Sequence, residues 1–322
     1  MDDFAQASAL DSGAIPVIDI APALDSSDVA GVAEAIHKAA TEVGFFYISG
    51  HGIAPELMEQ AFGVARDFFA LPEDIKSEVA VGTDQRGWMA TGMSKLQGSK
   101  THDLKEVFFW GRELDDGDPD LAAGKPMVAM NKWPAGFPRL RAELLPYYDA
   151  LCAVAGQVLS AVAVSLDQAP DAFHAAYARP LARGQLVYYP PSTAKDEAEE
   201  RFGVAPHTDF GVLTFLMQDN SGGLQVRLRS GEWVEAPPIP GTLVCNIGDL
   251  LQRWSNDRFV STVHRVINRS KGARYSIPVF FDPSPDAVID PRNLGAAEPK
   301  HAPVTAGDHI TGRNAKSFAQ HK

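Results

Sequence analysis

The sequence predicts a mainly β fold with flanking helices, in which the helices dominate the first half of the chain. Three observations lead to this prediction. Apolar residues recur at helical spacing in the first half, as on the buried face of a helix. Beyond about Arg183, short runs of β-branched or aromatic residues alternate with turn residues, which is typical of a β-sandwich or barrel. No linker rich in Pro, Gly or Ser divides the chain, so we expect one structural unit.

Three helices and one strand are predicted in the first half. The segment 28–43 has apolar residues at helical spacing and stops at Gly44, whereas 55–69 begins with a proline, which suits the first turn of a helix. The segment 142–166 is long and apolar, as expected of a largely buried helix. Residues 45–48 are aromatic or β-branched and predict a short buried strand.

In the second half, six runs are predicted as strands: 185–189, 211–217, 224–228, 242–247, 264–268 and 275–281. From about residue 282 the chain is rich in proline and is expected to cross the surface before a short terminal helix. We divide the unit into a tail (1–14), an N-terminal region (15–135), a long-helix region (136–180), a β core (181–285) and a C-terminal segment (286–322).

The composition excludes several classes of protein. The 322 residues are 45% hydrophobic and 22% charged, as in an ordinary globular chain and unlike a disordered one. The formal charge of −12 would repel a phosphate backbone, so we expect no nucleic-acid partner. Two cysteines, Cys152 and Cys245, are too few for a disulfide framework or a cysteine zinc site. No signal-peptide pattern or long uninterrupted apolar run is evident, so we expect a cytoplasmic protein without a membrane or obligate protein partner.

A candidate metal site begins at His207 and Asp209. On an extended chain, residues two apart point to the same face, so the imidazole and the carboxylate converge. His264, in a later strand, offers a third ligand. Two histidines and one carboxylate form the set that holds non-haem Fe(II) and leaves coordination positions open. Zinc would accept the same ligands, but the chain has no H-E-x-x-H motif to supply the general base of a zinc hydrolase.

Arg274 and Ser276 form a second same-face pair, ten residues after His264. A guanidinium matches a carboxylate with two parallel hydrogen bonds, and the hydroxyl adds one more. This pair would bind the distal carboxylate of a dicarboxylic keto acid whose keto-acid end chelates iron.

Read together, these motifs and others resemble the Fe(II)/2-oxoglutarate-dependent oxygenases of the isopenicillin N synthase-like group. The segments that carry the resemblance are 15–19 (IPVID), 44–53 (GFFYISGHGI), 68–72 (FFALP), 103–106 (DLKE), 131–134 (NKWP), 188–191 (YYPP), 207–211 (HTDFG), 222–226 (GGLQV), 246–249 (NIGD), 264–266 (HRV) and 274–276 (RYS). They extend over about residues 15–282, nearly the whole chain.

The resemblance implies a double-stranded β-helix (jelly-roll) core with flanking helices. It assigns His207, Asp209 and His264 as the catalytic iron ligands, and Arg274 and Ser276 as ligands of the 2-oxoglutarate C5 carboxylate.

It also places Tyr189 where relatives often use a tyrosine hydroxyl on the same carboxylate, although an aromatic packing role is an equal alternative. Val187 occupies the position where plant relatives often have asparagine.

The implied activity is oxidation of a small organic substrate with 2-oxoglutarate and O2, releasing succinate and CO2. Hydroxylation is the expected outcome, with desaturation or cyclisation as variants, and Fe(II) is the metal, with ascorbate as a supporting reductant. Two alternatives remain: an iron-dependent oxidase of the same group that uses no 2-oxoglutarate, and a non-enzymatic ligand-binding or sensor protein on the same scaffold.

The substrate is expected to be a small molecule with an apolar or aromatic body. The candidate pocket residues are Phe108, Trp110, Phe281 and Arg86, because aromatic walls with a few polar groups are usual in ligand sites. Strand alternation sends only one of Phe280 and Phe281 inward. For each ring, packing in the core is an equal alternative. Lys105 and Glu106 are expected to form a solvated pair.

Overall fold

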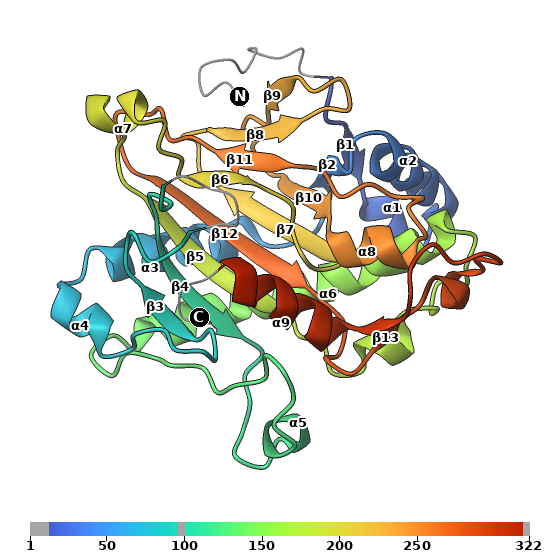
Figure 1. The fold of residues 1–322 in the computed structure, drawn as a ribbon, viewed down its shortest axis with the longest axis horizontal. Coiled ribbons are helices and arrows are strands. Elements are labelled where there is room, and N and C mark those ends of the chain that lie inside the picture. The colour runs from blue at the N-terminus through green and yellow to red at the C-terminus, as the bar shows by residue number, and fades with distance from the viewer. Residues whose placement is uncertain (1–12, 96–100, 318–322) are drawn as a thin grey trace.

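The computed structural model describes residues 13–95 and 101–317, and within them two β-sheets carry the core (Figure 1). The larger sheet has eight strands in the order β1-β2-β10-β7-β12-β5-β4-β3, and the smaller has four in the order β6-β11-β8-β9. A two-stranded sheet pairs β13 with β14. The prediction of a mainly β fold with flanking helices is confirmed, and the described strands form open sheets rather than a closed barrel.

The strands of the larger sheet are β1 (Val17–Asp19), β2 (Phe45–Ser49), β3 (Gly87–Met89), β4 (Glu106–Gly111), β5 (Arg183–Tyr189), β7 (Leu213–Gln218), β10 (Leu243–Ile247) and β12 (Arg274–Phe281). The other strands are β6 (Val204–His207), β8 (Leu224–Arg227), β9 (Trp233–Glu235), β11 (His264–Val266), β13 (Val288–Ile289) and β14 (Val304–Thr305). The helices are α1 (Ala21–Leu24), α2 (Val29–Glu42), α3 (Pro55–Phe69), α4 (Glu73–Ser77), α5 (Pro119–Ala122), α6 (Arg139–Ser165), α7 (Ala194–Ala198), α8 (Asp249–Trp254) and α9 (Ala306–Ser317), with 3-10 turns at His174–Tyr177 and Pro291–Leu294.

The predicted helices form close to the expected bounds because the chain supplies their ends. The Asp28 carboxylate accepts a hydrogen bond from the Gly31 N–H and caps α2, which stops before Gly44, a glycine with φ of +73°. All six strands predicted in the second half overlap an observed strand. The sequence patterns do not predict β1, β3, β4, β6, β9, β13 or β14. All of these except β4 are only two to four residues long, and β4 is apolar on both faces.

Alternation along the strands divides the core into two layers. In β2, Phe45 and Tyr47 pack between the two sheets, whereas Phe46 and Ile48 pack on the side covered by helices. The helices α2 and α3 pack on α6, and α3 and α6 also contact β12. The larger sheet is therefore buried on both faces, by helices on one side and by the smaller sheet on the other. The predicted site residues lie between the two sheets.

The helix α6 is long and apolar enough, by length and composition, to cross a membrane. In the structure it is a core helix, because its apolar face packs against α2 and α3, and residues such as Leu144, Leu151 and Val158 are buried there.

The C-terminal helix α9, dark red in Figure 1, lies in front of the larger sheet. Asn314 donates a hydrogen bond to Gln85, and Arg313 forms an ion pair with Asp249 at 2.9 Å. These contacts hold the helix against the end of the sandwich that carries the predicted site residues.

Candidate metal centre

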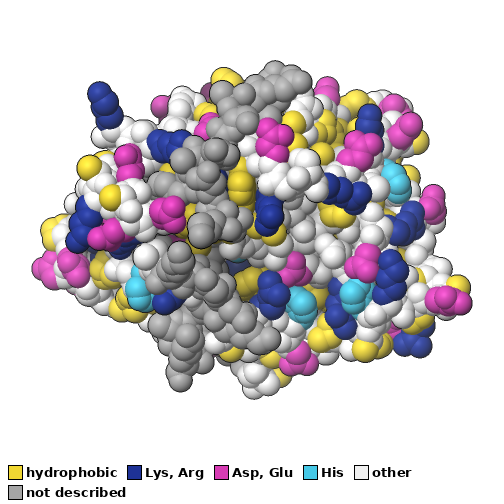
Figure 2. Space-filling view, turned by 45° about the horizontal axis from the view of Figure 1, so that its top comes forward, with side chains coloured by type: hydrophobic (Ala, Val, Ile, Leu, Met, Phe, Trp, Pro, Cys, Tyr) yellow, Lys and Arg dark blue, Asp and Glu magenta, His cyan; other side chains and the backbone are white. Residues whose placement is uncertain are grey.

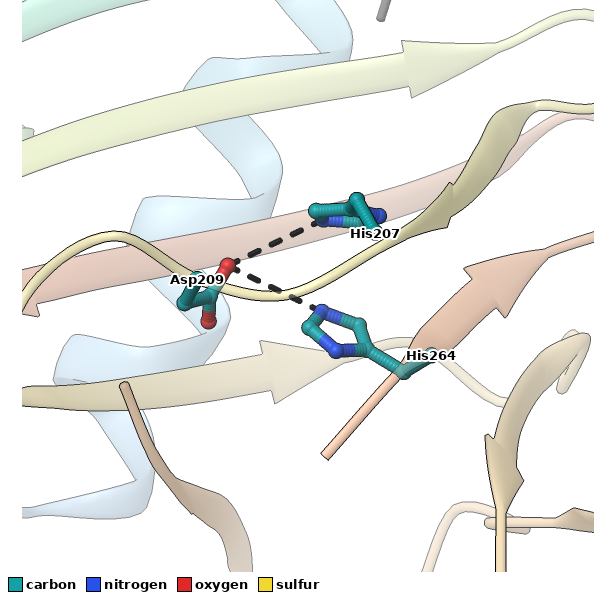
Figure 3. A group of neighbouring side chains, drawn as sticks. All are labelled: His207, Asp209 and His264. Atoms are coloured by element: carbon teal, nitrogen blue, oxygen red, sulfur yellow. Dashed lines mark ion pairs between the residues drawn. The ribbon is translucent and has the colours of Figure 1, made fainter. Parts of the chain in front are cut away.

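The structure brings His207, Asp209 and His264 together between the two sheets. His207 ends β6 and pairs directly with His264 at the start of β11, and Asp209 follows in the loop after β6. One carboxylate oxygen of Asp209 lies 3.7 Å from Nε2 of each histidine, and the three side chains converge on one point (Figure 3). All three candidate ligand atoms lie within 4.8 Å of one another. Two imidazole nitrogens and one oxygen on one side of a point suit a metal that keeps open positions.

The backbone fixes the tautomer of both histidines. Nδ1 of His207 lies 2.9 Å from the Ala205 carbonyl oxygen, and Nδ1 of His264 lies 3.1 Å from the Thr262 carbonyl oxygen. Because a carbonyl can only accept, each Nδ1 carries the proton and each Nε2 presents a lone pair to the centre. Burial, reinforced by His264, holds the pKa of His207 well below its ordinary value.

The second oxygen of Asp209 is held by two donors. It accepts hydrogen bonds from the Thr214 hydroxyl at 2.6 Å and from the Asn246 amide at 2.7 Å. Burial would raise the pKa of Asp209, but the two histidines and these hydrogen bonds outweigh burial and lower it. The carboxylate is therefore ionised, with one oxygen oriented and the other turned to the histidines.

Two small cavities adjoin this centre, one lined by all three side chains and the other by His207 and Asp209. The first, which we name the Arg274 cavity, is lined by Arg274, Ser276, Pro278 and Phe280 of β12, Gln185, Val187 and Tyr189 of β5, His207, Asp209, His264 and their neighbours. The second, the Arg183 cavity, is lined by Arg183 and Gln185 of β5, Val107 and Phe109 of β4, Gln85, Met89, Phe210, Phe280, Asn314 and their neighbours. Lys105, Gln185, Val204, His207, Asp209 and Phe280 border both.

A larger groove, about 280 Å³, lies between α3 and the loop before β10, and shares no lining residue with either cavity.

Arg274 is almost completely buried, lines its cavity and has one donor that the described residues leave unused. Its Nε donates to the Gly222 carbonyl at 2.7 Å, its Nη2 lies 3.5 Å from the Gln218 side-chain oxygen, and its guanidinium lies 4.7 Å from the centre of the Tyr189 ring. Its Nη1 is buried and has no hydrogen-bond partner among the described residues. A buried cation with an unused donor fits an anionic ligand, and a carboxylate would satisfy both needs.

The four residues expected to line a substrate pocket lie elsewhere, which corrects that expectation. Phe108 and Trp110 face the helices, because Val107 and Phe109 take the opposite face of β4. Trp110 covers Gly184, where a Cβ atom would overlap the indole.

Phe281 likewise packs in the helix-side core, with its ring 4.9 Å from that of Tyr177, and its neighbour Phe280 lines the cavities instead. Arg86 is buried and donates to the carbonyl oxygens of Asp84, Gln85 and Met127.

The cavities also contain residues that the sequence patterns do not single out, namely Lys105, Arg183 and Gln185. Alternation could have indicated the last two, because positions 183, 185, 187 and 189 share one face of β5. Lys105 is buried and forms an ion pair with Asp103 at 3.2 Å, whereas Glu106 pairs with Lys76 at 2.8 Å. The expected solvated pair of Lys105 and Glu106 is therefore wrong.

Comparison with known families agrees with this geometry. Residues 15–136 match the family model described as non-haem dioxygenase in morphine synthesis N-terminal, and residues 183–283 match that of the 2OG-Fe(II) oxygenase superfamily. A 2-oxoglutarate-Fe(II) type oxidoreductase of Emericella nidulans, hxnY, is 35% identical over 317 residues, which cover 95% of this chain and 90% of that protein.

Two solved structures show a similar fold. A full-length Neurospora crassa protein in complex with alpha-KG and thymine aligns with a TM-score of 0.83 and 29% identity, covering 96% of this chain and 99% of that one. The structure of JOX2 in complex with 2OG, Fe and JA aligns with a TM-score of 0.76 and 28% identity, covering 94% and 89%.

These similarities do not favour either alternative function, an iron-dependent oxidase that uses no 2-oxoglutarate or a non-enzymatic ligand-binding protein. The chain belongs to the 2OG-Fe(II) oxygenase superfamily, and it is a 2-oxoglutarate-dependent non-haem iron dioxygenase that oxidises a small organic substrate.

Proposed function

We propose that His207, Asp209 and His264 hold the iron, and that Arg274 and Ser276 bind the C5 carboxylate of 2-oxoglutarate. The observation that carries the proposal is that the two cavities meet at His207 and Asp209, with His264 on the side of the Arg274 cavity. One cavity ends at the buried Arg274, whose partners among the described residues are neutral, as a dicarboxylate requires. The other is left for the substrate, so co-substrate and substrate reach the metal from different sides.

Each part of the site has a separate task. Bound iron, 2-oxoglutarate and O2 supply the oxidation, in which the keto acid becomes succinate and CO2 and one oxygen atom goes to the substrate. Thr214 and Asn246 orient the Asp209 carboxylate, and the carbonyls of Ala205 and Thr262 orient the histidines. Tyr189 supports Arg274 with its ring face, which agrees with the packing role considered for it.

The substrate in this proposal is a small molecule held in the Arg183 cavity. Met89, Val107, Phe109, Phe210 and Phe280 give that cavity an apolar and aromatic body. The thymine bound by the Neurospora crassa relative is a small ring that would suit such walls. On the face seen in Figure 2, basic and acidic side chains are interspersed among the coloured residues, an arrangement that does not favour a polyanion. Hydroxylation is the proposed outcome.

The experiment that tests the proposal measures binding before turnover. Calorimetric titration of 2-oxoglutarate should show one site per chain in Ni(II)-loaded protein and much weaker binding in metal-free protein. Asp209→Ala removes the anionic ligand and should abolish metal binding, whereas the exposed Asp171→Ala should leave it unchanged. A screen of small ring compounds with Fe(II), O2 and ascorbate should then identify substrates by stimulated succinate release. Normal metal content and turnover in Asp209→Ala would contradict the assignment.

We also propose a cytoplasmic location. Cys152 and Cys245 are both free, which suits a reducing compartment, and the apolar helix α6 is packed in the core. Recovery of the protein in the membrane or secreted fraction of cells would contradict this.

A further inference from the structure

Two arginines occupy opposite ends of the same pair of strands. In the β5–β12 ladder, Arg274 is opposite Tyr189 at one end, and Phe280 is opposite Arg183 at the other. Each guanidinium lies over an aromatic ring, at 4.7 Å from the Tyr189 ring centre for Arg274 and 5.7 Å from the Phe280 ring centre for Arg183. The ladder thus presents one arginine to each cavity.

The two arginines differ in the charge of their partners. Arg274 contacts only neutral acceptors among the described residues, the Gly222 carbonyl and the Gln218 side chain. Arg183 forms an ion pair with Asp282, with Nη2 and a carboxylate oxygen 3.0 Å apart. A buried charge without a counter-ion is costly, so Arg274 requires an anionic ligand and Arg183 does not.

Asp282 is a built-in counter-ion. It is fully buried, and its other oxygen accepts a hydrogen bond from the Val212 N–H at 2.8 Å. Burial raises the pKa of the Asp282 carboxyl, whereas Arg183 and the Val212 N–H lower it; because both oxygens accept, the ionised form satisfies these donors without a proton. A Cβ atom at Gly211 would overlap this carboxylate, which explains why glycine follows the metal-ligand segment.

Arg183 nevertheless keeps donors for a ligand. Its Nε is buried without a partner among the described residues, and its Nη1 lies 3.5 Å from the Gln85 side-chain oxygen, the limit of a hydrogen bond. Gln185, next to it on the same face, lines the cavity with a side-chain amide. Phe280 offers an aromatic surface beside both.

We infer that the Arg183 cavity selects a neutral, planar carbonyl compound, such as a lactam, imide or aromatic amide, over a carboxylate. This inference rests on the function proposed above and specifies the substrate class of the same site. Arg183 and Gln185 bind the carbonyl or amide edge of the substrate, and Phe280 binds its face.

Among the described residues that line this cavity, an anionic substrate would find no uncompensated cation. Lys105, which borders it, is already paired with Asp103, as Arg183 is with Asp282. A carboxylate in this cavity would be a second negative charge beside the Arg183 guanidinium, which already pairs with Asp282. It would also lose its water shell without gaining a counter-ion of its own. A neutral carbonyl oxygen accepts the unused N–H groups and adds no charge.

The test compares two probes of nearly equal shape, benzamide and benzoate, binding to full-length protein loaded with Ni(II) and 2-oxoglutarate. Calorimetry should show that wild-type protein binds benzamide at least about tenfold more tightly than benzoate. Asp282→Asn removes the counter-ion of Arg183 and should shift this preference at least about tenfold toward benzoate. Loss of a residue with only a packing role would weaken both probes alike and would not shift the preference between a neutral and a charged probe.

Three further variants complete the design. Arg183→Lys keeps a cation beside Asp282 but lacks the planar fork, so benzamide binding should weaken about tenfold. Gln185→Leu leaves the ion pair intact and should also weaken benzamide binding, which keeps the test valid if Asp282→Asn does not fold. Arg229→Met changes an exposed arginine outside both cavities and should change nothing.

Stronger binding of benzoate than of benzamide by wild-type protein would overturn the inference. So would undetectable benzamide binding at millimolar concentration, or an unchanged preference in folded Asp282→Asn. 2-Oxoglutarate binding is measured in every sample, so that failure of the proposed function can be distinguished from failure of this inference. Its absence from Ni(II)-loaded wild-type protein contradicts the proposed function, whereas normal co-substrate binding with the wrong probe preference contradicts this inference alone.

Discussion

The hydrogen bond from Thr214 to Asp209 offers a quantitative test of how the metal centre is built. Thr214→Val replaces the hydroxyl with a methyl group of similar size and removes a 2.6 Å hydrogen bond to a buried carboxylate. A hydrogen bond to a charged group is worth about 1.5–3 kcal/mol. Since about 1.4 kcal/mol is a factor of ten, metal affinity should fall roughly 10- to 100-fold.

The loss should stay within that range because Asn246 still donates to the same oxygen. Asn246→Leu should cost a similar amount, and the double variant should cost more than either, since the oxygen is then buried with no donor. Competition of Co(II) between the protein and a chelator measures the affinity. Thr41→Val is the matched control, because the Thr41 hydroxyl is buried without a hydrogen-bond partner among the described residues. Wild-type affinity in both Thr214→Val and Asn246→Leu would refute the reasoning.

Three other outcomes follow from the same geometry. Arg274→Lys keeps the charge but loses the planar fork, so the dissociation constant for 2-oxoglutarate in calorimetry should rise at least about tenfold, or about 1.4 kcal/mol; an unchanged value would remove Arg274 from the co-substrate site. Trp110→Ala should lower the free energy of unfolding in urea by about 3–5 kcal/mol, because the indole is fully buried against Gly184, and a neutral effect would contradict its core position. Ni(II) at one hundred times its dissociation constant should stabilise the wild-type protein by about 2.7 kcal/mol and Asp209→Ala by nothing measurable, so an equal shift in both would indicate a different metal site.

The convergence of the candidate metal ligands could be predicted from the sequence because two of them are close together along the chain. His207 and Asp209 are two residues apart on an extended segment, so their convergence follows from strand geometry alone. Arg274 and Ser276 share a face of β12 for the same reason. Only the pairing of His264 with His207 required the fold, and the resemblance supplied it.

The pocket walls could not be predicted because both faces of the central strands are buried. In β4, Val107, Phe108, Phe109 and Trp110 are all apolar and buried, so alternation does not tell which face turns to the metal. The choice between Phe280 and Phe281 likewise depends on how β12 pairs with β5 and β7, which is a long-range property.

The ion pair of Arg183 and Asp282 joins residues 99 positions apart, and no local pattern links them. The buried position of Arg86 could not be predicted either, because its partners are backbone carbonyl groups, which every residue has and no sequence pattern marks.

Charge balance explains why two arginines on one ladder need different partners. In the proposed site, iron would bring two positive charges and Arg274 one, and Asp209 and the two carboxylates of 2-oxoglutarate would balance these. A loaded centre is therefore neutral before the substrate arrives, and it is buried between the sheets, where an uncompensated charge is costly. Arg183 and Lys105 preserve this balance only because Asp282 and Asp103 neutralise them. Hence the strand pair can place a guanidinium beside the substrate for hydrogen bonding without attracting a second anion to the metal.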